Sequence, residues 1–469
     1  MKAQLKVNFN KKLREWDGFG INYVAAAQTR DYRKWPQDYG SFGLLSENDR
    51  QQIIDLIFGD DGLKPSIGKM FIDSLQAGID TPENLNLDPN SFDSSMYDHH
   101  TTLKWMTYFM KEGVERTESR GEGFKLICSL YGPPAWTTKQ KVVRGRDIDP
   151  VYKYEVAKYI IAFIKFMKQQ EGLPIAYVSL HNEGGIEEIE RWPKDGTDGP
   201  EYVNHDYNAI WSEEQVVDFI RFMPYMLNQH SLEDLKIGNG ECTFLSGTTK
   251  YVKAIIEDPE ALLNYGLMTS HGFVDGQDSF TSEPIDLIRE KKANFHAWIT
   301  SASWGDMDIS FLTSIHKHIY ISKVNGYIPW AAVQCHSQWV GGDPNPGTAI
   351  LINDEGKWSI QRGYYLYKHY CPVGKSGMAV VETESNYDDI MVSAFSGNKT
   401  VHPDAMVLIN NGLNAKEVIL EIKGNKHVMY SCVVTDNNRT YEKIDDIIVE
   451  NDQINICLAP ESVMSLCGM

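Results

Sequence analysis

Short apolar runs rich in β-branched residues alternate with longer segments of helical periodicity from the N-terminus to about Gly363. Each run predicts a strand, and regular alternation of strand and helix is typical of repeated β-α units. The predicted strands are Trp16–Tyr23, Ser66–Asp73, Phe124–Tyr131, Ile175–His181, Lys236–Glu241, Leu267–Phe273, Phe295–Thr300 and Gly326–Val333. Eight strands, each followed by a helix, favour an α/β fold of the (β/α)8 TIM barrel type. A doubly wound sheet is the alternative.

Capping signals mark the start of several helices between these strands. Asp149 followed by Pro150 is an N-cap with proline at the first helical position. Ser212 and Gln215 have the spacing of a capping box. A further helix is predicted from Ser46 toward Ile57.

Beyond Gly363 the pattern changes to period-two strands separated by polar turns, which predicts an antiparallel β-sandwich. The alternating opening Ala3–Val7 predicts one more strand, at the edge of this sandwich. We therefore expect a catalytic barrel over 11–363 and a side domain built from 1–10 plus 364–469. The sandwich strands are Met378–Glu382, Ile390–Phe395, Met406–Ile409, Val418–Ile422, Val428–Thr435 and Ile454–Leu458.

The composition restricts the partners of this protein. The 469 residues include 45 basic and 64 acidic ones, a net charge of -19 that repels phosphate backbones, so nucleic acid is not expected as a partner. No run reaches the roughly 18 to 20 apolar residues of a spanning helix, so we expect no membrane partner. The first ten residues lack the hydrophobic core of a signal peptide. This favours a cytoplasmic protein as the sequence stands, or a secreted one if a signal was removed. The oligomeric state stays open.

The seven cysteines are scattered, without a CxxC pair, which predicts free thiols that are mostly buried. No His or Cys group has zinc-ligand spacing, so no metal is expected. Gly18-Phe19-Gly20 lacks the third glycine of a dinucleotide-binding loop. We expect no cofactor.

The strongest chemical signal follows the fourth predicted strand. There Asn182 and Glu183 place a carboxamide and a carboxylic acid at the barrel mouth, where the acid can protonate a leaving-group oxygen. A polar loop with a surface glutamate is the alternative. Trp136 after the third strand, His271 after the sixth and Trp330 after the eighth would line the same mouth.

Four motifs make the chain resemble glycoside hydrolase family 30. They are Gly18-Phe19-Gly20, Pro133-Pro134-Ala135-Trp136, Asn182-Glu183 and the segment Arg362–Tyr370. The resemblance covers nearly the whole chain. It implies a barrel with a side β-sandwich and retaining hydrolysis of β-glycosides. It also implies that Glu183 is the general acid/base and that Asn182 contacts the sugar beside the scissile bond.

The same resemblance implies which side chains bind the substrate. Trp136, His271 and Trp330 would shape the subsite of the sugar being cleaved. Asp73, and Tyr131 at the end of the third strand, are further candidates. Trp339, in a loop after the eighth strand, could stack on a sugar ring or be buried.

Ser301 departs from the family pattern. The family places its nucleophilic glutamate in a context like W-I-T-E, and this chain reads Trp298-Ile299-Thr300-Ser301. Retention needs two carboxyl groups about 5 to 5.5 Å apart, and serine without a base cannot easily replace one of them. Our preferred interpretation is a replaced nucleophile, giving an inactivated or glycosynthase-type protein. A natural non-hydrolytic sugar binder and a relocated nucleophile are the alternatives; candidates for the latter are Asp306, Asp308, Glu241 and Asp275.

The expected substrate is a plant or microbial oligosaccharide, polysaccharide or glycoside, with hydrolysis nearly abolished by Ser301. No arginine occurs between Arg289 and Arg362, which disfavours recognition of an acidic sugar by the last loops of the barrel. A barrel lyase or isomerase would need a metal or a lysine base at the mouth. The sugar, the linkage and the choice between exo and endo cleavage are not determined by the sequence.

Overall fold

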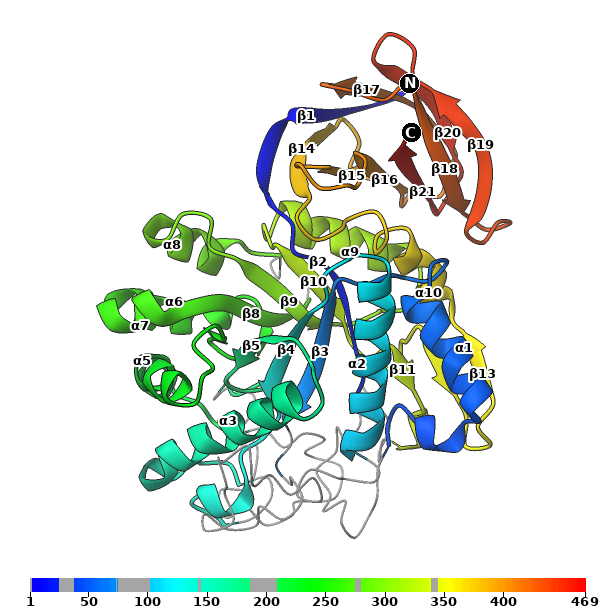
Figure 1. Cartoon of the computed structure of the whole chain (residues 1–469). Coiled ribbons are helices and arrows are strands. Elements are labelled where there is room, and N and C mark those ends of the chain that lie inside the picture. Colours follow the sequence, from blue (N-terminus) through cyan, green and yellow to red (C-terminus); the bar gives the residue numbers. More distant parts are fainter. Residues whose placement is uncertain are drawn as a thin grey trace.

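The computed structural model of the protein describes residues 2–24, 38–72, 74, 102–141, 145–185, 209–274, 280–338 and 345–469. The parallel strands form a closed eight-membered barrel, in which β6 and β7 together make up one of the eight strands (Figure 1). The barrel strands are β2 (Gly18–Asn22), β3 (Ile67–Ile72), β4 (Lys125–Leu130), β5 (Ile175–Ser179), β6 (Lys236–Gly238), β7 (Cys242–Phe244), β8 (Tyr265–Phe273), β9 (Ala297–Ala302) and β10 (Gly326–Pro329).

The strand order confirms the predicted barrel and excludes the doubly wound sheet. Neighbours run β6-β5-β4-β3-β2-β10-β9-β8-β7, and the pairing of β6 with β8 closes the ring. A separate apolar cluster, to which six of the barrel strands contribute one residue each, includes Ile67, Tyr177 and Trp298. Because this cluster fills one end of the barrel, the opposite, C-terminal ends of the strands are left to build a site.

Helices surround the barrel, and their caps follow the sequence signals. Ser46 caps α1, and Ser212 and Gln215 form both bonds of a capping box at the start of α5. Asp149 caps a short 3-10 turn over Pro150–Tyr152, and α3 begins only after it. The helices are α1 (Glu47–Phe58), α2 (Thr102–Ser119), α3 (Lys153–Gln169), α5 (Glu213–Gln229), α6 (Thr248–Glu257), α7 (Pro259–Asn264), α8 (Glu283–Lys291), α9 (Ile309–Tyr320) and α10 (Arg362–Lys368).

A small sheet follows β10 at the barrel mouth. It contains β11 (Val333–Gln334), β12 (Ile350–Ile352) and β13 (Trp358–Ile360). It leads the chain back to α10 and so to the second domain.

The β-sandwich lies above the barrel in Figure 1 and is built from one long, mostly antiparallel sheet that folds over its own core. Its order is β19-β18-β21-β16-β15-β14-β1-β17-β20. The strands are β1 (Ala3–Glu15), β14 (Ala379–Ser385), β15 (Ile390–Ser396), β16 (Ala405–Asn410), β17 (Lys416–Lys423), β18 (Met429–Thr435), β19 (Glu442–Ile448), β20 (Gln453–Leu458) and β21 (Ser462–Gly468).

The N-terminal strand β1 is not at an edge, which corrects the prediction from the alternating opening. It pairs antiparallel with β14 and parallel with β17, so both of its sides are hydrogen-bonded. Its buried alternation of Ala3, Leu5, Val7 and Phe9 was visible in the sequence. The partners on its two sides were not, because strand pairing joins residues far apart in the chain. The sequence prediction also missed β19 and β21.

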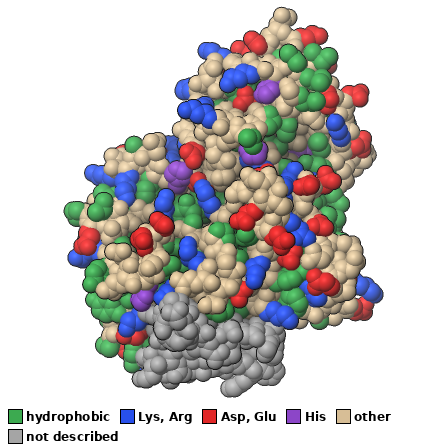
Figure 2. All heavy atoms as spheres, in the orientation of Figure 1, with side chains coloured by type: hydrophobic (Ala, Val, Ile, Leu, Met, Phe, Trp, Pro, Cys, Tyr) green, Lys and Arg blue, Asp and Glu red, His purple; other side chains and the backbone are tan. Residues whose placement is uncertain are grey.

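All seven cysteines are free and five are buried, as predicted. Among the described residues, no helix is both long enough and apolar enough to cross a membrane. Positive and negative side chains are interspersed over the face shown in Figure 2.

Buried polar contacts join the sandwich to the barrel. His369, directly after α10, bonds to Ser465 Oγ at 3.0 Å and to Thr435 Oγ1 at 2.8 Å. His316 on α9 bonds to Ser393 Oγ at 3.0 Å. Burial lowers the pKa of His369 to about 3 and that of His316 to about 4, so both imidazoles are neutral at physiological pH.

We predict that acid destabilises this protein through its buried histidines. Burial also lowers the pKa of His181 to about 3 and that of His318 to about 4. The unfolded chain takes up protons near pH 6.5 that the folded protein does not bind. The free energy of unfolding should therefore fall as pH drops from 6.5 toward 4, by about 1.4 kcal/mol per pH unit for each such group.

Urea unfolding between pH 7 and 4.5 would measure this slope. His369→Gln keeps hydrogen-bonding atoms but cannot be protonated, so its slope should be shallower by about one proton. His336→Gln, at an exposed histidine, is the matched control and should leave the slope unchanged. Equal slopes in His369→Gln and the unaltered chain would contradict the prediction.

Candidate active site

Glu183 is the first of the predicted residues at the barrel mouth, directly after β5. Its backbone has φ of 41°, a left-handed conformation that is strained for a residue with a side chain and is common at functional sites. The neighbouring Asn182 forms an isolated parallel bridge with Glu241, and Glu183 N donates to Glu241 O at 2.7 Å. The turn therefore ties Glu183 to the end of the next barrel strand.

His181 supports this turn from beneath. Gly184 N donates to His181 Nδ1 at 3.1 Å. A Cβ atom at Gly240, which has φ of 99°, would lie 2.1 Å from His181 Cδ2. The glycine is thus required by the ring that packs against it, and the ring in turn positions the loop that carries Glu183.

His271, in β8, contacts Glu183 directly. Its Nδ1 lies 2.9 Å from Glu183 Oε1, and its Nε2 lies 3.5 Å from Glu241 Oε2. Burial lowers the pKa of His271 and the Lys69 ammonium adds to this, but the two carboxylates outweigh both and raise the pKa above its usual value. A protonated imidazole would bridge the two glutamates.

Lys69, in the middle of β3, completes the arrangement. Its ammonium donates to Glu241 Oε2 at 2.9 Å, to Ser301 Oγ at 3.0 Å and to Thr300 O at 3.2 Å. Both Lys69 and Glu241 side chains are 0% exposed. Burial raises the pKa of Glu241, but Lys69 and His271 outweigh it and bring the pKa to about 2.

Four ionisable side chains, alternately basic and acidic, therefore run from the barrel interior to its mouth: Lys69, Glu241, His271 and Glu183. The three inner groups are buried, and the Glu183 side chain at the outer end is 16% exposed. Because basic and acidic groups are paired along this row, the desolvation cost of burying them in a low-dielectric site is offset by their attraction. Only its outer carboxyl group is open to a substrate.

Ser301 lies near the end of β9 and is buried. Its hydroxyl accepts a hydrogen bond from the Lys69 ammonium, which is charged because Glu241 is its partner. A protonated amine cannot take the serine proton, so this contact does not activate Ser301 as a nucleophile. The contact instead places a fixed positive charge beside position 301.

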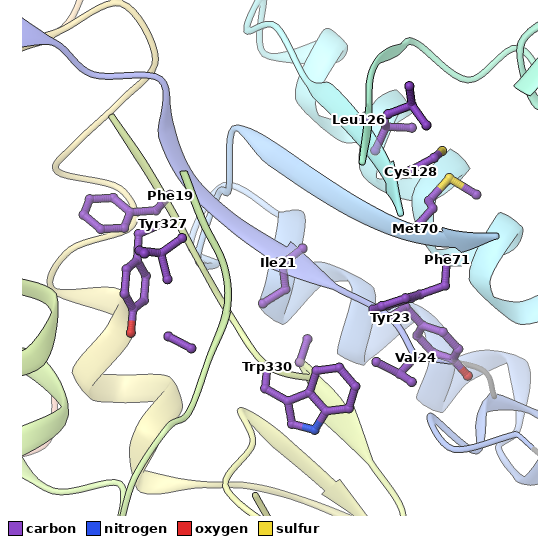
Figure 3. Close-up of a cluster of buried hydrophobic side chains, with 14 of the residues drawn as sticks. Phe19, Ile21, Tyr23, Val24, Met70, Phe71, Leu126, Cys128, Tyr327 and Trp330 are labelled. Atoms are coloured by element: carbon purple, nitrogen blue, oxygen red, sulfur yellow. The ribbon is translucent and has the colours of Figure 1, made fainter. Parts of the chain in front are cut away.

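Aromatic side chains pack together where several barrel strands end, and Figure 3 shows two of them, Phe71 and Trp330, within a cluster of buried hydrophobic side chains. The Phe71 ring lies 5.4 Å from that of Tyr131 and 6.2 Å from that of Trp330. Trp136 is half-buried in a 3-10 turn, and its ring lies 5.9 Å from that of Tyr152.

Two predicted residues, Asp73 and Trp339, lie outside the described residues, as does the nucleophile candidate Asp275. Asp308 accepts from Ser310 N at 2.8 Å and caps α9, and Asp306 is exposed.

Sequence reasoning underestimated Lys69 and Glu241. The sequence pattern predicts Glu241 only as a candidate for a relocated nucleophile. The available signal was a lone lysine inside the apolar run Ile67–Ile72, since a charge at the centre of a buried strand needs a counter-charge. The sequence does not indicate which of the acidic residues supplies it.

The whole chain has the fold of glycoside hydrolase family 30. An endoxylanase of that family from Clostridium papyrosolvens C71 matches with a TM-score of 0.67 at 18% identity, with 99% of both chains covered. The catalytic domain of xylanase C from Talaromyces cellulolyticus matches with a TM-score of 0.71 at 15% identity, over 99% of this chain and 100% of that one. An endo-β-1,6-glucanase matches with a TM-score of 0.68 at 18% identity, over 99% of this chain and 93% of that one.

No family model matches the sequence, and no curated protein does. The similarity is thus visible in the tertiary structure, and it shows the fold: the expected barrel with a side β-sandwich.

We predict that Lys69→Met strongly destabilises the protein, because it leaves the buried carboxylate of Glu241 with only the 3.5 Å contact to His271. The expected loss is about 3 to 5 kcal/mol of unfolding free energy, and the double variant Lys69→Met, Glu241→Gln should recover part of it. Lys357→Met is the matched control, because the ion pair of Lys357 with Glu355 is exposed and should cost about 1 kcal/mol or less. Denaturant titration of the four proteins measures the coupling. Equal losses for the two lysines would refute the role assigned to the buried pair.

Proposed function

We propose that this protein is a retaining β-glycosidase in architecture whose nucleophile is replaced by Ser301, so that it binds glycosides with little or no hydrolysis. The proposal rests on one observation above others: the Lys69 ammonium donates to Ser301 Oγ at 3.0 Å, while Glu183 is held ready by His271. A cation at this place would stabilise a carboxylate at position 301. The chain offers a hydroxyl group there instead.

In the parent reaction, a carboxylate at position 301 would attack the anomeric carbon while Glu183 protonates the departing oxygen. Glu183 would then remove a proton from the water that releases the sugar. Asn182 would hold a hydroxyl group of the bound sugar, and Trp136, Tyr131 and Trp330 would enclose its ring. Asp73 and Trp339 remain candidates for further contacts.

A relocated nucleophile is less well supported. Among the described candidates, Glu241 shares the contact of His271 with Glu183, but its side chain is fully buried and paired with Lys69. A nucleophile must reach the anomeric carbon, and freeing Glu241 for this would leave the ammonium without its counter-charge. We assign Glu241 to positioning His271 and Lys69.

We predict that Ser301→Glu creates hydrolytic activity. The new carboxylate would be paired with Lys69 and could form the glycosyl-enzyme, so the rate on aryl β-glycosides should rise by about 10³-fold or more over the unaltered chain. Release of nitrophenol from a panel of β-xylosides, β-glucosides and β-galactosides measures this and identifies the sugar.

Ser303→Glu, two residues further along, is the matched control and should stay inactive. Glu183→Gln in the Ser301→Glu background should remove most of the gained activity. The nucleophile assignment would be refuted if Ser301→Glu were as inactive as Ser303→Glu on every glycoside of the panel. If sugars still bound to both, a natural carbohydrate-binding protein would become the better description.

We also predict that the unaltered chain transfers sugar from an α-glycosyl fluoride to an acceptor alcohol. Glu183 would take the acceptor proton, the acceptor oxygen would attack the anomeric carbon, and fluoride would leave with the bonding electrons. Ser301→Gly should retain this activity and Glu183→Gln should lose it, which fluoride release and product chromatography would show. Equal fluoride release from the unaltered chain and Glu183→Gln would contradict the prediction.

A further inference from the structure

A cavity of about 430 Å³ lies at the junction of the barrel and the sandwich, at the end of the barrel opposite the candidate active site. It is lined by the last residues of β1, by the C-terminal end of α8, and by the residues that precede β9 and β10. The sandwich contributes Ala379 at the start of β14 and Asn398 after β15. In Figure 1 the reader can follow β1 down from the sandwich to this junction.

Two arginines in the lining are held by oxygen atoms that carry no charge. Arg289 donates to Phe295 O at 3.0 Å, to Lys323 O at 3.0 Å and to Asn325 Oδ1 at 2.7 Å. Arg14 donates to Val324 O at 2.7 Å and also to Ile319 O. These bonds fix both guanidinium groups without neutralising them.

The same two arginines lack acidic partners. Among the residues that the structure describes, neither guanidinium has a carboxylate within the 4.0 Å of an ion pair. Asp286, one turn earlier in α8, is paired with Lys323 and interacts with Arg289 only through its charge, beyond ion-pair distance. Burial and the neighbouring Arg289 lower the pKa of Arg14 to about 9, the effect of one cation on another. This is unusual in a chain with 64 acidic and 45 basic residues.

The remaining charged groups of the cavity leave an excess of positive charge. Lys12 donates to the neutral Asn398 Oδ1 at 2.7 Å, and Glu15 is the one carboxylate among the lining residues. His296 is already bonded to Asp17, at 2.6 Å. Three cations thus face one carboxylate, a balance that suits a dianion.

The unused hydrogen-bond donors point to the same ligand. A guanidinium carries five N–H groups and an ammonium three. The contacts above use two N–H groups of Arg14, three of Arg289 and one of Lys12. The donors that remain exceed what the two oxygens of a carboxylate accept, and they match a phosphate group.

We propose that this cavity is a binding site for a phosphate dianion, supplied either as inorganic phosphate or as a phosphomonoester such as a sugar phosphate. Arg14 and Arg289 would bind the phosphate oxygens, with Lys12 completing the site at its rim. Because the site joins β1 to α8 and to the loops before β9 and β10, its occupancy would link the two domains. This proposal is independent of the activity proposed for the barrel mouth.

Calorimetric titration of the full chain at low ionic strength tests the site, with inorganic phosphate and glucose 6-phosphate as the probes. We expect saturable binding of one equivalent. Lys12→Met should weaken it about tenfold, the effect of losing one charge-assisted hydrogen bond. Glu15→Gln should strengthen it, because the variant removes the only repelling carboxylate of the lining. Tenfold tighter binding of glucose 6-phosphate would identify a phosphomonoester site, and equal affinities a site for free phosphate.

Lys11→Met is the matched control: it removes the same charge one residue away, but Lys11 is paired with Glu382 and does not line the cavity. Its affinity should stay within about twofold of that of the unaltered chain. The proposal would be overturned if neither probe bound saturably at concentrations up to about 20 mM, because a weaker site would not be useful. The proposal would also be overturned if Lys11→Met and Lys12→Met weakened phosphate binding equally. Arg289→Lys, which keeps the charge but loses the fork, should also weaken binding.

Discussion

A buried ammonium group is the constraint on which the candidate site depends. Lys69 lies inside a barrel strand, where an unpaired charge would cost several kcal/mol, so the surrounding structure has to supply acceptors and an anion. Glu241 supplies the charge, and its backbone also bonds to the turn that carries Glu183. Together with Glu183, the same pair shifts the pKa of His271. Stability and chemistry therefore depend on the same few contacts.

This arrangement bears on the proposal that Ser301 stands where a nucleophile would be expected. The charge relay from Lys69 to Glu183 is complete without a carboxylate at Ser301, so the barrel can fold with a serine there. The cation beside that serine nevertheless provides the environment that a carboxylate would need. We interpret the site as one that retains substrate positioning and proton transfer but lacks the group that attacks carbon.

At the interface between the two domains, buried polar side chains are hydrogen-bonded to neutral partners. His369 and His316 bond to hydroxyl groups of the sandwich and remain neutral, whereas Arg14 and Arg289 bond to carbonyls and remain charged. The histidine contacts close the interface between the domains. The arginine contacts leave an electropositive cavity between the domains, away from the barrel mouth.

The sequence alone determined the class of fold and led to Glu183 as the proposed acid/base residue, because periodicity, capping residues and the Asn182-Glu183 motif are local signals. The (β/α)8 barrel was confirmed by the strand order, while Ser212 and Ser46 cap the helices they were expected to cap. Only the tertiary structure decided that β1 lies inside the sandwich sheet, that Glu241 pairs with Lys69, and that Arg14 lies near Arg289. These are contacts between residues far apart in the chain, and their partners are chosen by packing and by the cost of burying charge rather than by any local pattern.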